Sequence, residues 1–360
     1  MKRIMISPRK YIQGAGELAN IGTYACEFSD RALLVVSDAD LGRVQAELRE
    51  AQANRPFELI PGHFREECTK KEIDRMKALL VENRCGLVIG MGGGKALDTA
   101  KAVSHLTGKP VIIVPTIAAT DAPTSKLAII YSEEGKFEEY FHLDKNPDLV
   151  LVDSAVIAKA PVRFLVSGMG DALATYFEAR SCLRSGAANM PGGKSTKAAL
   201  AIAKACYETL MEDSIKAKAA CENNVVTSAL ENIIEANILM SGLGFESGGL
   251  AACHAIHDGL TVLEEAHHCY HGEKVAFGVI AHLVLENADT QEIDSVVRYC
   301  KSVGLPTCLK DLGVHDPDDE KISAVAEAAC APGETIHNMP FEVTPSMVFA
   351  AIKVADQLGR

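Results

Sequence analysis

The sequence predicts an α/β domain built on a parallel sheet, followed by an all-helical domain. Over the first 160 residues, short apolar runs alternate with amphipathic segments, which is the pattern of strands joined by helices. After about Pro161 strand-like runs vanish, and Ala, Leu, Glu and Lys recur at helical spacing. A chain of 360 residues also exceeds one typical hydrophobic core. We therefore expect two domains, over residues 1–160 and 161–360.

The expected elements of the first domain follow one another in strand and helix order. Apolar runs predict strands over 31–36, 85–90, 110–115 and 148–153, and amphipathic segments predict helices over 72–83 and 96–106. Because the runs are apolar throughout, the strands should be covered on both faces, as in a parallel sheet. In the second domain we expect helices over 196–210, 228–240, 292–304 and 323–330, and a loop at 186–193.

Composition excludes several classes of protein. Hydrophobic residues make up 48% of the chain and charged residues 23%, so it is not disordered, and a net charge of −12 argues against a nucleic-acid partner. No apolar run resembles a signal sequence or a membrane span, so we expect a cytoplasmic protein without a membrane partner. The eleven cysteines form no CxxC pair and are expected to be buried thiols.

A glycine-rich loop, GMGGGKA, joins the expected strand 85–90 to the helix that follows it. Glycines at such a turn let a phosphate approach the backbone N–H groups at the helix start, so Gly94 and Lys95 are candidate nucleotide contacts. The loop matches neither G-x-G-x-x-G nor a Walker motif, and a tight packing turn is the alternative. Asp98 either faces the cofactor or stabilises the helix dipole.

Polar residues follow two other expected strands. Asp38 comes after strand 31–36, where a carboxylate can bind ribose hydroxyls and favour NAD over NADP, although it could equally be a loop acid. The segment PTIAATDAPTS follows strand 110–115 and carries Thr116, Asp121 and Ser125. Ligands of open α/β sheets bind beyond the carboxyl ends of strands, so this loop is a candidate site; a capped turn is the alternative.

Five of the eleven histidines lie close together in the second domain: His254, His257, His267, His268 and His271. A catalytic zinc takes three protein ligands, and two imidazoles with one carboxylate would suit zinc or iron(II). The candidate carboxylate is Asp171, at an expected helix start where an N-terminal cap is the alternative role. A surface histidine patch or hydrogen-bonded core histidines also remain open.

Several blocks of sequence together resemble the glycerol dehydrogenases of the iron-containing (group III) alcohol dehydrogenase superfamily. They are GMGGGKALDTAKA, PTIAATDAPTS, NPDLVLVD, SGMGDALATYFEA, GFESGGLAACHAIHDGL, AHHCYHGEKVAFG and GETIHNMP. The resemblance implies a Rossmann-like NAD-binding domain and a helical domain in a dehydroquinate synthase-like architecture. It also implies a metal in the cleft between the domains and a homo-oligomer, typically an octamer.

The resemblance assigns roles to individual residues. It places one zinc per chain on Asp171, His254 and His271, and the substrate near Asp121, His254 and Phe245. The implied NAD contacts are Asp38, Gly94, Lys95, Asp98, Thr116, Ala119, Ser125, Leu127 and Tyr131. Iron-dependent relatives carry a further histidine where this chain has Thr175, which favours zinc.

The implied reaction is the reversible oxidation of glycerol to dihydroxyacetone. Zinc would lower the pKa of the C2 hydroxyl so that an alkoxide forms, and hydride would pass from C2 to NAD. A related diol such as 1,2-propanediol is an alternative substrate. A lyase resembling 3-dehydroquinate synthase is a second alternative, but it should line its cleft with a cluster of basic residues, and the blocks offer only Lys95 and Lys126.

Overall fold

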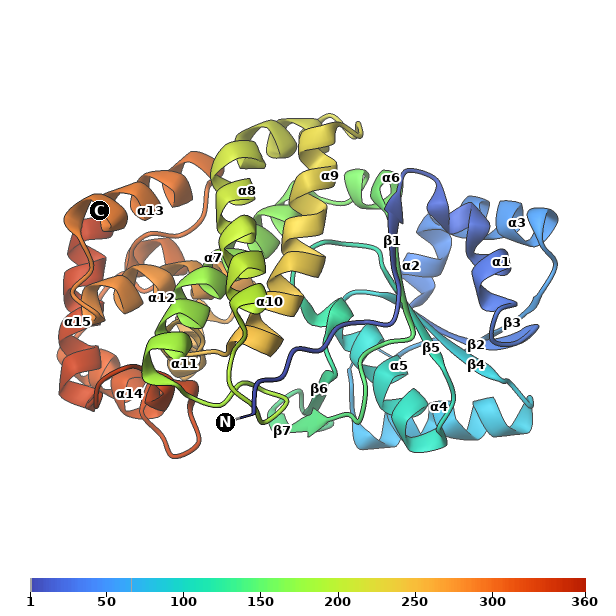
Figure 1. Ribbon diagram of the computed structural model, residues 1–360, viewed down its shortest axis with the longest axis horizontal. Coiled ribbons are helices and arrows are strands. Elements are labelled where there is room, and N and C mark those ends of the chain that lie inside the picture. The colour runs from blue at the N-terminus through green and yellow to red at the C-terminus, as the bar shows by residue number, and fades with distance from the viewer. Residues whose placement is uncertain (1, 66) are drawn as a thin grey trace. The chain divides into compact units, whose positions relative to one another are not determined.

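The computed structural model describes residues 2–65 and 67–360, which form two compact units (Figure 1). The α/β unit comprises Ser7–Pro161 and Ala220–Ile234, and the helical unit comprises residues 2–6, Val162–Ala219 and Glu235–Arg360. The chain passes into the helical unit after Pro161, but it returns to the α/β unit for fifteen residues. The two expected domains, over residues 1–160 and 161–360, do not include this return of the chain to the α/β unit.

The α/β unit contains a sheet of six parallel strands in the order β1-β8-β5-β4-β2-β3. The strands are β1 (Tyr11–Gly14), β2 (Arg31–Val36), β3 (Glu58–Pro61), β4 (Leu87–Gly92), β5 (Val111–Pro115) and β8 (Leu149–Asp153). In the register, Val36 pairs with Met91, and Gly92 pairs with Pro115. The carboxyl ends of β2, β4 and β5 therefore meet at one edge of the sheet.

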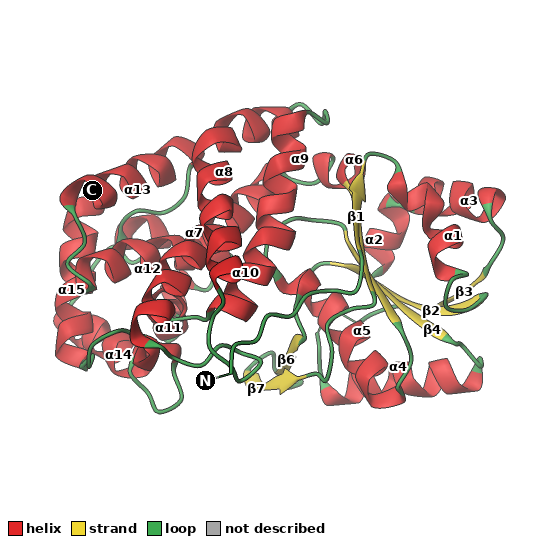
Figure 2. Cartoon of the chain, viewed as in Figure 1, coloured by secondary structure: helices red, strands yellow, loops and turns green. Residues whose placement is uncertain are grey.

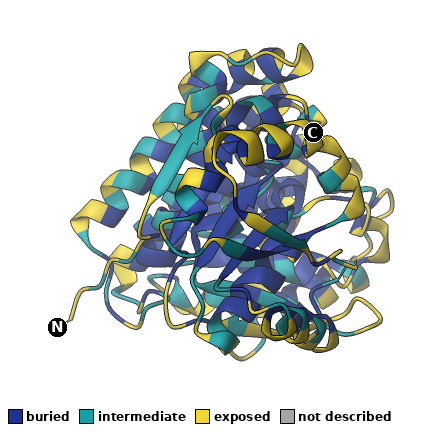
Figure 3. Ribbon diagram, turned by 90° about the vertical axis from the view of Figure 1, so that its right-hand side faces the viewer, coloured by how far each residue is buried: buried dark blue, intermediate teal, exposed yellow. Residues whose placement is uncertain are grey.

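Helices cover both faces of this sheet, as Figure 2 shows. One face carries α4 (Lys70–Glu82) and α5 (Gly94–Thr107), and the other carries η1 (Glu17–Asn20), α1 (Ile21–Ala25) and α3 (Gln45–Asn54). The edge strands β1 and β3 are only partly buried, whereas β2, β4, β5 and β8 are almost wholly buried. Buried strand residues are dark blue in Figure 3, and exposed residues lie on the outward sides of the helices. Burial on both faces explains why these strands are apolar at every position.

The predicted strands and helices of this unit are confirmed to within two residues at each end. Two short strands, β1 and β3, were not predicted, because four residues at a sheet edge carry little apolar pattern. An antiparallel hairpin of β6 (Leu127–Tyr131) and β7 (Phe137–His142) was also not predicted. In β7 both faces are largely exposed, so its sequence does not alternate cleanly.

Eight of the remaining α-helices in the described residues lie wholly or mainly in the helical unit. They are α7 (Val162–Ser185), α8 (Lys197–Glu222), α10 (Ser241–Gly248), α11 (Ala252–Leu260), α12 (His271–Leu285), α13 (Thr290–Val303), α14 (Asp319–Ala329) and α15 (Pro345–Gly359). The short helices α2 (Asp38–Arg43), α6 (Ser154–Ala158) and α9 (Ser228–Glu235) complete the set of α-helices in the described residues. Within residues 2–65 and 67–360, none of these helices is both long and apolar enough to cross a membrane.

Glycines let three helices of this unit approach one another backbone to backbone. A Cβ added to Gly272 of α12 would lie 1.8 Å from the carbonyl oxygen of Ser167 in α7. A Cβ on Gly278 of α12 would lie 2.5 Å from the carbonyl oxygen of Cys253 in α11. Side chains on α7, α11 and α12 are thereby brought within reach of one another.

All eleven cysteines are free thiols, and most are buried, as predicted.

Candidate active site

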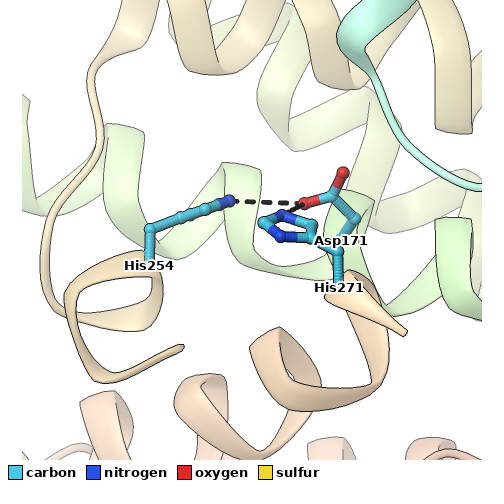
Figure 4. Close-up of side chains that lie close together, drawn as sticks. All are labelled: Asp171, His254 and His271. Carbon is cyan, nitrogen blue, oxygen red and sulfur yellow. Dashed lines mark hydrogen bonds and ion pairs between the residues drawn. The ribbon is translucent and has the colours of Figure 1, made fainter. Parts of the chain in front are cut away.

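Asp171, His254 and His271 converge in the helical unit from three different helices. Asp171 lies on α7, His254 lies on α11, and His271 is the first residue of α12. The Oδ1 atom of Asp171 is 3.3 Å from Nε2 of His254 and 3.1 Å from Nε2 of His271 (Figure 4). One donor atom from each residue lies within 4.8 Å of the others. One carboxylate with two imidazoles at this spacing fits a divalent cation.

The helical context of Asp171 differs from the sequence-based expectation. We expected Asp171 at a helix start, but α7 begins at Val162, so Asp171 lies in the middle of the helix and is not a cap. The expected helix start rested on Gly168 and Gly170, which precede Asp171 in the sequence. Gly170 instead lets α12 approach, because its added Cβ would lie 2.2 Å from the carbonyl oxygen of Gly272. This contact places His271, the neighbour of Gly272, beside Asp171.

The charges in this cluster keep the carboxylate ionised. Asp171 is only 1% exposed, and burial alone would raise its pKa. The charge of His271 and hydrogen bonds from both imidazoles outweigh burial, so the pKa lies well below its ordinary value. The pKa of His254 is raised, since Glu178 and Asp171 overcome the opposite effect of burial. Metal binding at this cluster would release protons.

The remaining three histidines of the sequence cluster have other partners. His257 is buried, its Nδ1 is 2.9 Å from Oδ1 of Asp258, and its ring centre is 4.2 Å from that of His271. Burial and the charge of His271 lower the pKa of His257 to about 4. His267 and His268 lie in the exposed connection between α11 and α12, where they bond to backbone carbonyl oxygens. The five histidines are therefore neither one site nor one surface patch.

The glycine loop of the α/β unit forms the turn from β4 into α5. Gly92 ends β4 with a φ of 139°, Gly93 is the N-cap, and Gly94 begins the helix. Positive φ at Gly92 explains the need for glycine at this position. The free N–H groups of a helix start can bind a phosphate, so the geometry agrees with a nucleotide site.

Lys95 and Thr116 border this turn. Nζ of Lys95 is 2.6 Å from Oε2 of Glu67 and 5.4 Å from the ring centre of Tyr131. Thr116 donates its N–H to the carbonyl oxygen of Gly92 and its hydroxyl to Oδ1 of Asp40, at 3.1 and 2.9 Å. The structure thus places Lys95, Tyr131 and Thr116 around the glycine turn.

Asp98 has a buried structural role. Its Oδ1 forms an ion pair of 2.8 Å with Lys101, and its Oδ2 accepts the N–H of Ile129 in β6 at 3.0 Å. Burial raises its pKa against the opposing effect of Lys101. Asp98 therefore ties the hairpin to α5, a role that neither sequence-based alternative described.

Other predicted residues of the α/β unit are more dispersed. Asp38 begins α2 and is exposed, with its Oδ1 2.6 Å from Nδ1 of His63. Lys101 bonds to the carbonyl oxygen of Leu127, and Ser125 donates its hydroxyl to the carbonyl oxygen of Ala122 at 3.3 Å. Ala119 and Asp121 lie in the loop that precedes the short 3₁₀-helix η2 (Ala122–Thr124). In the helical unit, Phe245 is buried on α10.

Three further residues contact predicted site residues and were not predicted themselves. Glu178 bonds to His254, Asp40 accepts from Thr116, and Glu67 pairs with Lys95. Of these three residues, only Glu178 could have been recognised as a site residue from the sequence. It follows Asp171 by seven residues, or about two helical turns, which places both carboxylates on one helix face.

Known proteins of one family resemble this chain in sequence and in fold. The model of the iron-containing alcohol dehydrogenase family matches residues 8–154. A glycerol dehydrogenase from Citrobacter freundii is 51% identical over 360 residues, covering 100% of this chain and 99% of the relative. A glycolaldehyde reductase from Halobacterium salinarum is 46% identical, with coverage of 100% and 99%. The crystal structure of a probable glycerol dehydrogenase from Sinorhizobium meliloti 1021 has a TM-score of 0.93 at 47% identity, with the same coverage.

The fold and these similarities define an oxidoreductase that acts on CH–OH groups. The chain belongs to the iron-containing alcohol dehydrogenase family, and within that family it groups with the glycerol dehydrogenases. The resemblance drawn from the sequence blocks is thereby confirmed. The expected Rossmann-like α/β domain and helical domain are also confirmed.

Proposed function

We propose that this enzyme oxidises glycerol reversibly to dihydroxyacetone, with NAD as hydride acceptor and one zinc ion held by Asp171, His254 and His271. The observation that carries the proposal is the convergence of these three donor groups within 4.8 Å. The chain that contains them is 51% identical over its full length to a glycerol dehydrogenase. Membership of an oxidoreductase family also argues against the alternative of a dehydroquinate synthase-like lyase.

Each residue of the cluster has a property that suits metal binding. Asp171 is buried and keeps its negative charge, and His254 and His271 both direct Nε2 toward it. When bound, zinc supplies a Lewis acid that lowers the pKa of an alcohol hydroxyl. In this proposal Asp121 accepts a hydrogen bond from a substrate hydroxyl, and Phe245 provides an apolar wall.

The surroundings of Thr175 support a set of three ligands, without the fourth ligand of iron-dependent relatives. Thr175 lies one helical turn after Asp171, at the position where the resemblance places a fourth ligand in iron-dependent relatives. Its hydroxyl is 2.8 Å from that of Ser241, and a Cβ added to Gly244 would lie 2.4 Å from its methyl carbon. Three ligands leave an open position for substrate, as catalytic zinc requires.

The proposed NAD site is the edge of the sheet at the glycine turn. The helix start at Gly94 and the amine of Lys95 would bind the pyrophosphate, and Asp38 would accept hydrogen bonds from a ribose. Thr116 and Tyr131 border this turn. Ala119 and Ser125, in the segment between β5 and β6, and Leu127, the first residue of β6, complete the proposed contacts together with Asp98. NAD supplies the hydride chemistry, and these residues supply orientation.

An assay of NAD reduction with metal analysis on the same sample tests the proposal. The substrates should be glycerol, 1,2-propanediol and ethanol, and glycolaldehyde should be tested in the reverse direction with NADH. We expect glycerol to be oxidised, about one zinc per chain, and loss of activity on chelation with recovery when zinc is added. Full activity of metal-free protein would contradict the metal assignment. If the enzyme prefers another diol or glycolaldehyde, the proposal of glycerol as its main substrate is wrong.

A matched pair of histidine variants tests the ligand set. His271→Ala should lose zinc and activity. His267→Ala should keep both, because His267 is exposed and its ring bonds to the carbonyl oxygen of Thr261.

The cytoplasmic location and the octameric homo-oligomer remain predictions, which cell fractionation and light scattering of the purified enzyme would test.

A further inference from the structure

A third carboxylate, that of Glu178, lies behind the proposed metal ligands. Glu178 is on α7, and its side chain is fully buried. Its Oε2 is 2.6 Å from Nδ1 of His254, the ring nitrogen on the opposite side from Nε2. Its Oε1 accepts the backbone N–H groups of Ala251 and His254, at 2.8 and 3.0 Å.

These hydrogen bonds fix the start of α11 as well as the imidazole. The first N–H groups of a helix lack partners within that helix, and Ala251, the N-cap of α11, has no side chain that could accept them. Glu178 accepts two of these N–H groups from a neighbouring helix. The backbone of His254 and its ring are therefore held by the same carboxylate.

The contact at Nδ1 also selects one tautomer of His254. An ionised carboxylate only accepts hydrogen bonds, so the nitrogen that faces Glu178 must carry a proton. A neutral imidazole then has its lone pair on Nε2, the atom that faces Asp171. A carboxylate behind a ligating histidine also raises the basicity of the ligand.

We infer that Glu178 is a positioning residue, which holds His254 in the orientation and tautomer that ligate the metal. The inference rests on the proposed function, because it requires a metal at Asp171, His254 and His271. Glu178 itself does not join the ligand set, since its two oxygens are occupied by Nδ1 of His254 and by the two backbone N–H groups.

Glutamine at position 178 should fail in this role while keeping the size of the side chain. Its single carbonyl oxygen can accept either from the backbone of α11 or from Nδ1 of His254. When that oxygen stays with the backbone, the amide NH₂ faces Nδ1, and it favours the tautomer with the proton on Nε2. That tautomer cannot ligate a metal through Nε2.

A matched control is available at Glu286, the C-cap of α12. Glu286 is 2% exposed in its side chain, and it pairs with Arg180 and Arg184. Glu286→Gln therefore removes a buried negative charge from the same unit without touching His254. Loss of metal through general destabilisation of the unit would appear in both variants.

The experiment measures zinc affinity of the full-length wild type, Glu178→Gln and Glu286→Gln by competition with a chromogenic chelator. We expect Glu178→Gln to bind zinc about 10- to 100-fold more weakly than the wild type. Glu286→Gln should stay within about threefold, since it makes no contact with the ligands. Equal affinity of Glu178→Gln and the wild type, or equal losses in both variants, would overturn the inference.

Nitrogen NMR of the wild type provides a second readout that does not depend on a folded variant. With zinc bound, the ring of His254 should carry its proton on Nδ1, and a proton on Nε2 would refute the role of Glu178. If the wild type binds no zinc, the metal site of the proposed function fails as well. Zinc binding with an unchanged Glu178→Gln variant would leave the proposed function standing and remove only this inference.

Discussion

The guanidinium group of Arg163 binds both carboxylate oxygens of Glu273, with N–O distances of 2.6 and 2.7 Å. Glu273 in turn accepts the N–H of Tyr270 at 2.7 Å, and the guanidinium carbon of Arg163 lies 4.5 Å from the centre of the Tyr270 ring. These contacts link α7 to the beginning of α12. They therefore fix the helix start at which His271 lies.

Replacement of Glu273 should weaken this helix start. Glu273→Ala would leave the N–H of Tyr270 without its partner, and we expect it to lower the free energy of unfolding by about 1–2 kcal/mol. Zinc affinity should also fall, because His271 is less well held. Thermal denaturation and zinc titration measure the two effects. Lys71→Ala is the control, since its ion pair with Glu133 is exposed and should contribute little to stability. Equal effects of the two variants would contradict the prediction.

The close approach of α7 and α12 should not tolerate a methyl group. In Gly272→Ala the new Cβ would lie 1.8 Å from the carbonyl oxygen of Ser167, so the helices must separate. We expect a loss of about 3 kcal/mol or more, beyond the gain of about 1 kcal/mol in helix propensity. Gly42→Ala in α2 is the control, because a Cβ there meets no atom within 4 Å. Urea unfolding of both variants is the measurement, and a stable Gly272→Ala variant would refute the packing argument.

The stability of the protein should depend on the ionisation of Glu334. Burial and the charge of Asp258 raise the pKa of Glu334 to about 7 from an ordinary value of 4.5. The folded state thus binds this proton more tightly than the unfolded state, so stability falls as pH rises from about 4.5 to 7. Glu334→Gln should match the wild type near pH 4 and melt about 2 °C higher at pH 8, a small effect because the group is partly exposed. A difference in melting temperature that does not vary with pH would contradict the assignment.

The proposed preference for NAD depends on the carboxylate of Asp38. A negative charge after β2 should accept hydrogen bonds from a ribose and repel a 2′-phosphate. In Asp38→Ser, we expect the ratio of kcat/KM for NAD to that for NADP to fall about tenfold, or about 1.4 kcal/mol. Asp144→Ser, which removes another exposed acid, should leave the ratio unchanged. An unchanged ratio in Asp38→Ser would place the ribose elsewhere.

The fold was largely predictable because its strands are buried on both faces. The strand β2 was predicted at its observed bounds, since all but its first residue are buried. The hairpin β6 and β7 escaped prediction because the side chains of β7 are largely exposed, so burial imposes no pattern on it. The return of residues 220–234 to the α/β unit also has no local signal, because it depends on contacts between distant segments.

The candidate metal site was only partly predictable from the residues themselves. Spacing could not choose two ligands from five histidines, and the resemblance to a family made that choice. The reason is physical, because the ligands meet only where glycines let α7, α11 and α12 touch. Gly170, one of these glycines, misled the prediction at Asp171, since glycine in a sequence suggests a helix end as readily as a close contact.

The division of the chain into units has a consequence for the order of events during protein synthesis. The α/β unit has all of its residues once position 234 has left the ribosome, so it can fold first. The helical unit needs α11, α12 and the later helices that pack on them, including α15. Residues 2–6 belong to that late unit, where Ile4 bonds to Lys194 and Ile6 bonds to Ser247. The start of the chain must therefore wait for its partners, and the three proposed metal ligands come together only after the α/β unit can already have formed.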